Sequence, residues 1–164
     1  LRLSLGESAA IDYADEKVAL MDWHADWANA KALPVAASAC CTQEDRHAID
    51  LLFAGMNVIP VWSKDHAGLY ALRTIAMLVN EGCEAVLHNV ASEQDIDAAM
   101  KYGVNYPQGP FEWAEKIGYS IILQTLENMY RIYGEERYRP SIYLKKKAAL
   151  GQAQQSQQQL RAAG

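Results

Sequence analysis

Side chains that could carry chemistry are sparse in this 164-residue chain, which has four histidines and three cysteines. A histidine can act as a general base near neutral pH, and His24 follows an apolar run typical of a strand. We interpret His24 as a loop or surface imidazole, with a general base as the alternative. Cys40, Cys41 and His47 lack the paired spacing of zinc ligands. We expect His47 and His88 on solvent-facing helix positions.

The elements that would position these residues alternate in type over the first third of the chain. Apolar runs at residues 18–21, 33–37 and 57–62 predict three short strands. Between the second and third runs, Thr42 is a good N-cap residue and precedes apolar positions at helical spacing. Residues 1–62 therefore predict a small α/β segment in the order strand, strand, helix, strand.

From residue 63 the pattern is helical. Five helices are predicted, and they cover Leu69–Leu87, Ser92–Gly103, Phe111–Ile117, Ile121–Tyr133 and Pro140 to about Leu150. The tail at 151–164 is rich in Gln and Ala, so we expect it to be flexible. The predicted fold class is mainly α, with domains at 1–62 and 63–150 and the flexible tail at 151–164.

Composition limits the classes of function. The net charge is −5 without a basic stripe, which argues against nucleic-acid binding. The longest apolar runs are too short to cross a bilayer, and no signal-peptide pattern opens the chain. Three cysteines do not make a disulfide framework, so we expect buried, reduced thiols in a soluble cytoplasmic protein. Because the chain begins at Leu1 rather than Met, we interpret it as a piece of a longer protein.

Four motifs follow one another between residues 65 and 110. They are Asp65-His-Ala-Gly-Leu-Tyr-Ala-Leu-Arg73, Asn80-Glu81, Ile96-Asp-Ala-Ala-Met100 and Gly103-Val-Asn-Tyr-Pro-Gln-Gly-Pro110. Their order and spacing resemble the C-terminal domain of 3-hydroxyacyl-CoA dehydrogenases. The Gly103 motif and the segment from Tyr133 to Pro140 are most similar to the second C-terminal repeat of long bacterial members. Those members act on 3-hydroxybutyryl-CoA or 3-hydroxyadipyl-CoA.

The resemblance implies a helical substrate and assembly domain, preceded by a small α/β segment that looks like the end of a Rossmann domain. A parent enzyme of this kind oxidises 3-hydroxyacyl-CoA with NAD, and its upstream NAD-binding and first helical domains would be partners of this chain. Arg73, Asn80 and Tyr106 are the candidate substrate-binding residues. For Arg73 we favour pairing with a carboxylate such as Glu81, and for Asn80 a hydrogen bond in helix packing.

The catalytic parts of the family are missing from this sequence. A Rossmann pyrophosphate turn needs Gly-x-Gly-x-x-Gly, and no two glycines here are spaced two apart. On the family pattern, the catalytic His falls at Asp22 and the helper Asn at Leu72. The orienting Glu has no candidate, because no acid occurs between Asp26 and Glu44. We therefore expect no catalytic, cofactor-binding or metal-binding residue in the chain.

Our interpretation is the substrate-pocket and assembly portion of an NAD-dependent 3-hydroxyacyl-CoA dehydrogenase, inactive by itself. The alternative is a non-catalytic interaction or scaffold domain of the same fold. The apolar stripes of 69–87 and 121–133 look wide for a short chain and predict a homodimer around these helices. Gly103 and Gly109 are expected to be critical for the backbone, Gly103 through a positive φ.

Overall fold

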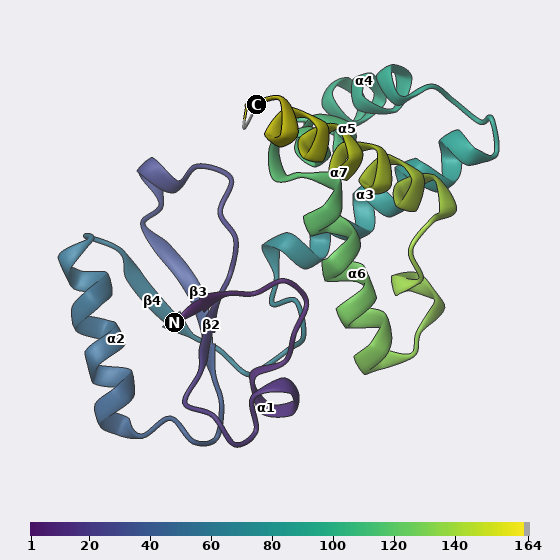
Figure 1. Cartoon of the computed structure of the whole chain (residues 1–164). Helices are drawn as coiled ribbons and strands as arrows, with labels where there is room; N and C mark the ends of the chain where they lie inside the picture. The colour runs from purple at the N-terminus through teal and green to yellow at the C-terminus, as the bar shows by residue number, and fades with distance from the viewer. Residues whose placement is uncertain (163–164) are drawn as a thin grey trace. The chain divides into compact units, whose positions relative to one another are not determined.

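Strands and helices follow the order expected from the sequence in a computed structural model that describes residues 1–162. The elements are β1 (Arg2–Leu3), α1 (Ala9–Asp12), β2 (Ala19–Met21), η1 (Trp27–Asn29), β3 (Ala32–Ala37), α2 (Gln43–Gly55), β4 (Ile59–Trp62), α3 (Ala71–Leu87), α4 (Glu93–Gly103), α5 (Pro110–Ile117), α6 (Tyr119–Tyr133), η2 (Glu136–Tyr138) and α7 (Ile142–Ala162). Figure 1 shows the strands in the N-terminal part and α3 to α7 in the rest. The expected fold class, mainly helical with a small α/β segment in front, is confirmed.

The described residues form two compact units. The first contains residues 1–74 and 128–134, and the second contains residues 75–127 together with the segment from 135 onward. Helices α3 and α6 therefore each contribute residues to both units. The domain boundary expected between residues 62 and 63 coincides with the change from strands to helices. The two compact units divide the chain differently, because each unit contains part of α3 and part of α6.

A four-stranded sheet in the order β1-β2-β3-β4 organises the first unit. β1 and β2 are parallel, β2 and β3 are antiparallel, and β3 and β4 are parallel. The three strands and the helix expected in residues 18–62 are confirmed as β2, β3, α2 and β4. β1 and α1 were not predicted, because they are two and four residues long and carry no apolar periodicity.

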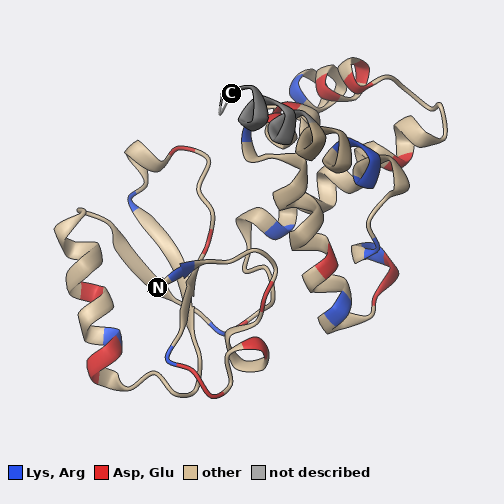
Figure 2. Cartoon of the chain, viewed as in Figure 1, with Lys and Arg blue, Asp and Glu red and all other residues tan. Residues whose placement is uncertain are grey.

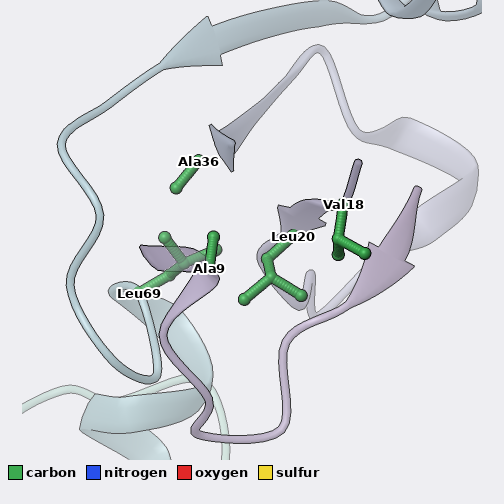
Figure 3. Packing of buried hydrophobic residues seen from close by; sticks show 5 residues of the cluster. All are labelled: Ala9, Val18, Leu20, Ala36 and Leu69. Carbon is green, nitrogen blue, oxygen red and sulfur yellow. The ribbon is translucent and has the colours of Figure 1, made fainter. Parts of the chain in front are cut away.

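The sheet has an apolar core on each face. On one face, Ala19, Leu33 and Val35 pack with Phe53 of α2. On the other face, Val18, Leu20 and Ala36 pack with Ala9 of α1 and with Leu69 (Figure 3). Side chains of alternate strand residues thus reach opposite faces, as strand geometry requires.

The apolar stripes of α3 and α6 are core. Ile75, Ala76, Val79 and Cys83 of α3 are at most 7% exposed, and α6 buries Ile122 and Leu126 completely. The expectation that these stripes leave a large uncovered patch is therefore wrong. A homodimer remains a prediction, but exposed apolar stripes no longer support an interface around α3 and α6.

Capping residues begin helices where the sequence indicated. Thr42 and Asp45 form a reciprocal capping box at α2, and Ser92 accepts the N–H of Asp95 at α4. The helix ends differ from expectation at Gly103, which is the last residue of α4 and has no positive φ. Asn105, two residues later, has φ 59° instead. The predicted left-handed conformation of Gly103 is wrong, since a polar Asn takes that conformation.

The last helix is longer than predicted. α7 continues to Ala162, whereas the apolar pattern indicated an end near Leu150. Its polar Gln-rich half lacks a stripe that would reveal a helix by periodicity. The last two residues of the expected flexible tail, 163 and 164, lie outside the described residues. Among the helices that the structure describes, none combines the length and apolar character needed to cross a membrane.

A helix cap at the candidate active-site position

Asp22 lies at the end of β2 and is completely buried. Its carboxylate accepts four backbone N–H groups: Trp23 at 2.8 Å, Tyr70 at 2.9 Å, Ala71 at 2.8 Å and Leu72 at 3.4 Å. Ala71 and Leu72 belong to the first turn of α3 and Tyr70 immediately precedes it, where N–H groups have no partner within the helix. Asp22 is therefore an N-terminal cap for α3, placed 48 to 50 residues away in the sequence.

The turn before α3 explains why this cap is needed. Gly68 has φ 80° and Leu69 has φ 47°, and the second value is rare for a residue with a side chain. Leu69 is nevertheless 1% exposed, because its side chain fills the core on the α1 side of the sheet (Figure 3). Burial of Leu69 and the Asp22 hydrogen bonds together stabilise a strained turn.

The neighbouring strand has no acid that could orient a base. β3 offers Asp22 a backbone contact, in which the Asp22 N–H donates to the Pro34 carbonyl at 2.9 Å. Val35 is the next residue, and it is completely buried and apolar. A base at this end of β2 would therefore lack the carboxylate that sets the tautomer of a catalytic imidazole.

His24 lies two residues beyond Asp22 on the loop that follows β2. Its Nδ1 accepts the N–H of Asp26 at 3.0 Å, and its ring meets the edge of Trp27 with centroids 6.4 Å apart. An accepting Nδ1 leaves the proton of a neutral imidazole on Nε2. These contacts agree with the loop role favoured from the sequence.

The geometry does not fit a bound dinucleotide in this unit. Gly6, with φ 95°, lies in the connection from β1 to α1, as in a nucleotide-binding turn. However, the carboxylate of Asp65 already accepts the N–H groups of Ala9 and Ala10, each at 2.9 Å. Ser8 Oγ accepts the N–H of Ile11. A pyrophosphate would have to displace a carboxylate from the first turn of a four-residue helix.

Arg73, the first of the three candidate substrate-binding residues, stacks on an aromatic ring. Its guanidinium lies 5.0 Å from the centroid of Tyr133, and Nη1 donates to the Tyr133 hydroxyl at 3.4 Å. Both residues belong to the first unit. This contact holds the C-terminal end of α6 against the start of α3 and gives Arg73 a cation–π partner.

Asn80 lies within the second unit and is 3% exposed. Its Nδ2 donates to the Arg139 carbonyl at 2.9 Å, and its Oδ1 accepts the N–H of Ser141 at 2.8 Å. The amide thereby holds the segment before α7 to the middle of α3. This geometry agrees with the helix-packing hydrogen bond that the sequence favoured.

Tyr106, in the loop between α4 and α5, is 37% exposed and meets Trp113 edge to face at 5.8 Å. The three candidate substrate-binding residues thus have separate neighbours. Two cavities of the described residues, of about 460 Å³ beside α2 and about 370 Å³ at the start of α6, are lined by other residues.

The sequence did not predict a polar contact between α4 and α5 in the second unit. Asp97 of α4 accepts the N–H groups of Phe111 at 2.8 Å and Glu112 at 3.2 Å, at the start of α5. Burial raises the pKa of Asp97 above its ordinary value, although these two hydrogen bonds act in the opposite direction. The Ile-Asp-Ala-Ala-Met stretch is thus a capping motif as well as a family motif.

A second polar cluster ties α7 to α4. Glu93 accepts the Tyr143 hydroxyl at 2.7 Å and pairs with Lys147 at 2.8 Å. The hydrogen bond to Glu93 raises the pKa of Tyr143 to about 12, and burial raises the pKa of Cys83 to about 12. Neither group is activated for proton transfer or nucleophilic attack. Lys147, the last residue of the basic run Lys145-Lys146-Lys147, therefore has a structural partner on α4.

Two family models together match almost the whole chain. Residues 1–66 match the 3-hydroxybutyryl-CoA dehydrogenase reduced Rossmann-fold domain. Residues 68–160 match the 3-hydroxyacyl-CoA dehydrogenase C-terminal domain. The junction of the two models falls at the Gly68–Leu69 turn that Asp22 caps.

Similar proteins carry the same family names. The 3-hydroxyadipyl-CoA dehydrogenase of Escherichia coli strain K12 is 51% identical over 86 residues, which are 52% of this chain and 18% of that protein. A probable 3-hydroxybutyryl-CoA dehydrogenase of Bacillus subtilis is 28% identical over 91% of this chain and 52% of its own length. The crystal structure of a 3-hydroxybutyryl-CoA dehydrogenase from E. coli K12 superposes with a TM-score of 0.82 at 38% identity, covering 90% of this chain and 31% of that one. The chain thus spans about half or less of these relatives.

Proposed function

Since the chain belongs to the 3-hydroxyacyl-CoA dehydrogenase family, we propose that it is the non-catalytic, substrate-pocket and assembly part of a longer NAD-dependent enzyme of that family. The observation that carries the proposal is Asp22. The position that the resemblance assigns to the catalytic base holds a buried carboxylate, and its oxygens accept four backbone N–H groups. A residue committed in this way cannot take a proton from a substrate hydroxyl.

NAD would be bound by the upstream domain of the parent protein. The glycine turn is missing from this sequence, and the α1 N-terminus is capped by Asp65. When bound, NAD accepts the hydride from the substrate carbon that bears the hydroxyl. The residues of this chain would position the acyl-CoA, and Arg73, Asn80 and Tyr106 remain the proposed substrate contacts.

The substrate class we propose is a short 3-hydroxyacyl-CoA, such as the 3-hydroxyadipyl thioester formed in aromatic-acid degradation. The 51% identity to a 3-hydroxyadipyl-CoA dehydrogenase supports this choice over the longer thioesters of fatty-acid β-oxidation. A cytoplasmic location, a homodimer and contact with the upstream NAD-binding and first helical domains complete the proposal. The competing proposal is a scaffold or interaction domain that binds no thioester.

Calorimetric titration of the chain with NADH tests the first part of this proposal, and we expect no binding in the micromolar range. An assay of NADH consumption with acetoacetyl-CoA should show no turnover. Turnover that disappears in His24→Ala would refute the proposal, because it would make His24 the base.

Equilibrium dialysis with acetoacetyl-CoA separates a substrate-pocket domain from a scaffold. We expect weak binding that decreases in Arg73→Ala more than in the control Arg46→Ala, whose guanidinium also stacks on an aromatic ring, that of Trp62. Absence of binding in the wild-type chain would favour the scaffold.

A further inference from the structure

Two free cysteines follow one another in the turn between β3 and α2. The N–H of Cys41 donates to the Ser38 carbonyl at 3.2 Å and closes this turn. Cys40 is exposed and Cys41 is partly buried, whereas Cys83 is completely buried in α3. The chain therefore presents one pair of neighbouring thiols to solvent, and its third thiol is out of reach.

Both thiols of this pair are directed towards the same segment, residues 14–18. The Cys40 thiol donates to the Ala14 carbonyl at 3.2 Å, and the Cys41 thiol donates to the Val18 carbonyl at 3.4 Å. Consecutive side chains of a strand point to opposite faces, but these two lie in a turn and share one side of it. Because S–H groups are weak donors, both sulfurs can leave these carbonyls at low cost. The pair is therefore free to hold one common ligand.

The covalent geometry of adjacent residues decides what can join the two sulfurs. Consecutive Cα atoms are about 3.8 Å apart across a trans peptide, whereas a disulfide usually needs a separation of about 4.4–6.8 Å. A direct S–S bond between Cys40 and Cys41 would therefore be strained. An atom placed between the two sulfurs enlarges the ring and relieves this strain, so the geometry favours a ligand that binds both thiols over their oxidation.

The charge around the pair disfavours an anionic ligand. Figure 2 shows acidic residues at the start of α2, which are Glu44 and Asp45. The segment before β2 adds Asp15 and Glu16, and its basic residue, Lys17, is paired with Asp45 at 2.9 Å. An anionic thiol reagent such as glutathione disulfide would meet like charges here. The ligand that fits this site carries no negative charge.

A metal ion that needs three or four protein ligands also fits poorly. Among the residues that the structure describes, no group of three or more His, Cys, Asp or Glu side chains could hold such an ion. A trivalent arsenical, by contrast, is uncharged at neutral pH, and its soft arsenic atom needs only two sulfurs from the protein.

We propose that Cys40 and Cys41 form a binding site for trivalent arsenicals, in which one arsenic atom bridges the two sulfurs. Each thiol gives its proton to a hydroxyl group of the arsenical. Two As–S bonds replace two As–O bonds and two molecules of water leave, so nothing is oxidised or reduced. The site is independent of the thioester binding proposed for the chain.

Intact-mass spectrometry of the folded full chain with one equivalent of phenylarsonous acid tests the proposal. We expect one adduct per chain, with the mass of the acid less two molecules of water. Because two sulfurs of one chain bind at a high effective concentration, the adduct should persist in an excess of the monothiol glutathione. The dithiol 2,3-dimercaptopropanol should remove it. An adduct that glutathione strips from the wild type overturns the proposal.

Single substitutions show which thiols hold the arsenic. Cys40→Ser and Cys41→Ser should each reduce the adduct that remains in glutathione by at least about tenfold, because one As–S bond cannot resist exchange. Cys83→Ala is the matched control, since it removes a buried thiol and leaves the pair intact. It should keep the full adduct. A full adduct in either serine variant, or its loss in Cys83→Ala, overturns the proposal.

Discussion

The carboxylate of Asp97 fills the space beside the backbone of Gly109, where any Cβ atom would overlap it. Asp97 cannot move aside freely, because it accepts the N–H groups of Phe111 and Glu112 at the start of α5. Gly109 itself has an ordinary φ of −75°. Glycine is therefore required here by the close approach of a side chain rather than by backbone conformation.

Gly109→Ala should destabilise the protein by about 1–3 kcal/mol, because the added methyl group must displace a hydrogen-bonded carboxylate. Urea unfolding followed by circular dichroism measures the difference. Gly103→Ala is the matched control, since its Cβ meets no atom within 4 Å and its φ is not positive. That control should be neutral or stabilising by about 0.5–1 kcal/mol. A Gly109→Ala variant as stable as Gly103→Ala would contradict the steric argument.

Asp22→Ala should be strongly destabilising, because it leaves N–H groups of the first turn of α3 without a partner in a buried site. The expected loss is on the order of 3 kcal/mol in the free energy of unfolding. Asp22→Asn keeps one acceptor oxygen and should lie between the wild type and Ala. Asp15→Ala, an exposed acid of the same unit, should change little. If Asp15→Ala and Asp22→Ala unfold at the same urea concentration, the cap does not stabilise the fold.

The α2 capping box should lose its effect in acid. Hydrogen bonds from Lys17 and Thr42 lower the pKa of Asp45 from 3.8 to about 2. A lowered pKa in the folded state means that the stabilisation is present above 3.8 and is lost as the pH falls towards 2. Asp45→Asn should therefore be less stable than the wild type at neutral pH and nearly equal to it at the acidic end. Glu44→Gln, which leaves the box intact, should not reproduce this pH dependence.

The three cysteines should react at very different rates with a thiol reagent. Cys40 is exposed, whereas Cys83 is completely buried and has a pKa raised to about 12. The expectation of buried thiols is thus confirmed for Cys83 and wrong for Cys40, while Cys41 is only partly buried. Mass spectrometry after timed iodoacetamide treatment should find Cys40 modified first and Cys83 only after denaturation. Early modification of Cys83 in a Cys40→Ser variant would show that the core around α3 opens readily.

The sequence by itself determined the elements and the family. Apolar spacing located six helices and three strands, and the Thr42 and Ser92 caps lie within three residues of their partners. Residues so close in the sequence interact within one helix or turn, so apolar periodicity and capping patterns are enough to predict these interactions. The motifs from Asp65 to Pro110 identified the family, and the lack of a glycine turn and an orienting acid indicated that the catalytic parts are absent.

Only the tertiary structure shows which contacts are made by the residues at the positions of the missing catalytic groups. Asp22 stands 48 residues before Tyr70, and Asp97 stands 14 before Phe111, so neither cap follows from neighbouring residues. The role of the apolar stripes could not be predicted from the sequence either. An apolar stripe on a helix such as α3 has the same pattern whether it packs into the core or against another molecule. Such contacts form between segments that are far apart in the sequence. Their free energy depends on interatomic distances and burial, which local sequence patterns do not contain.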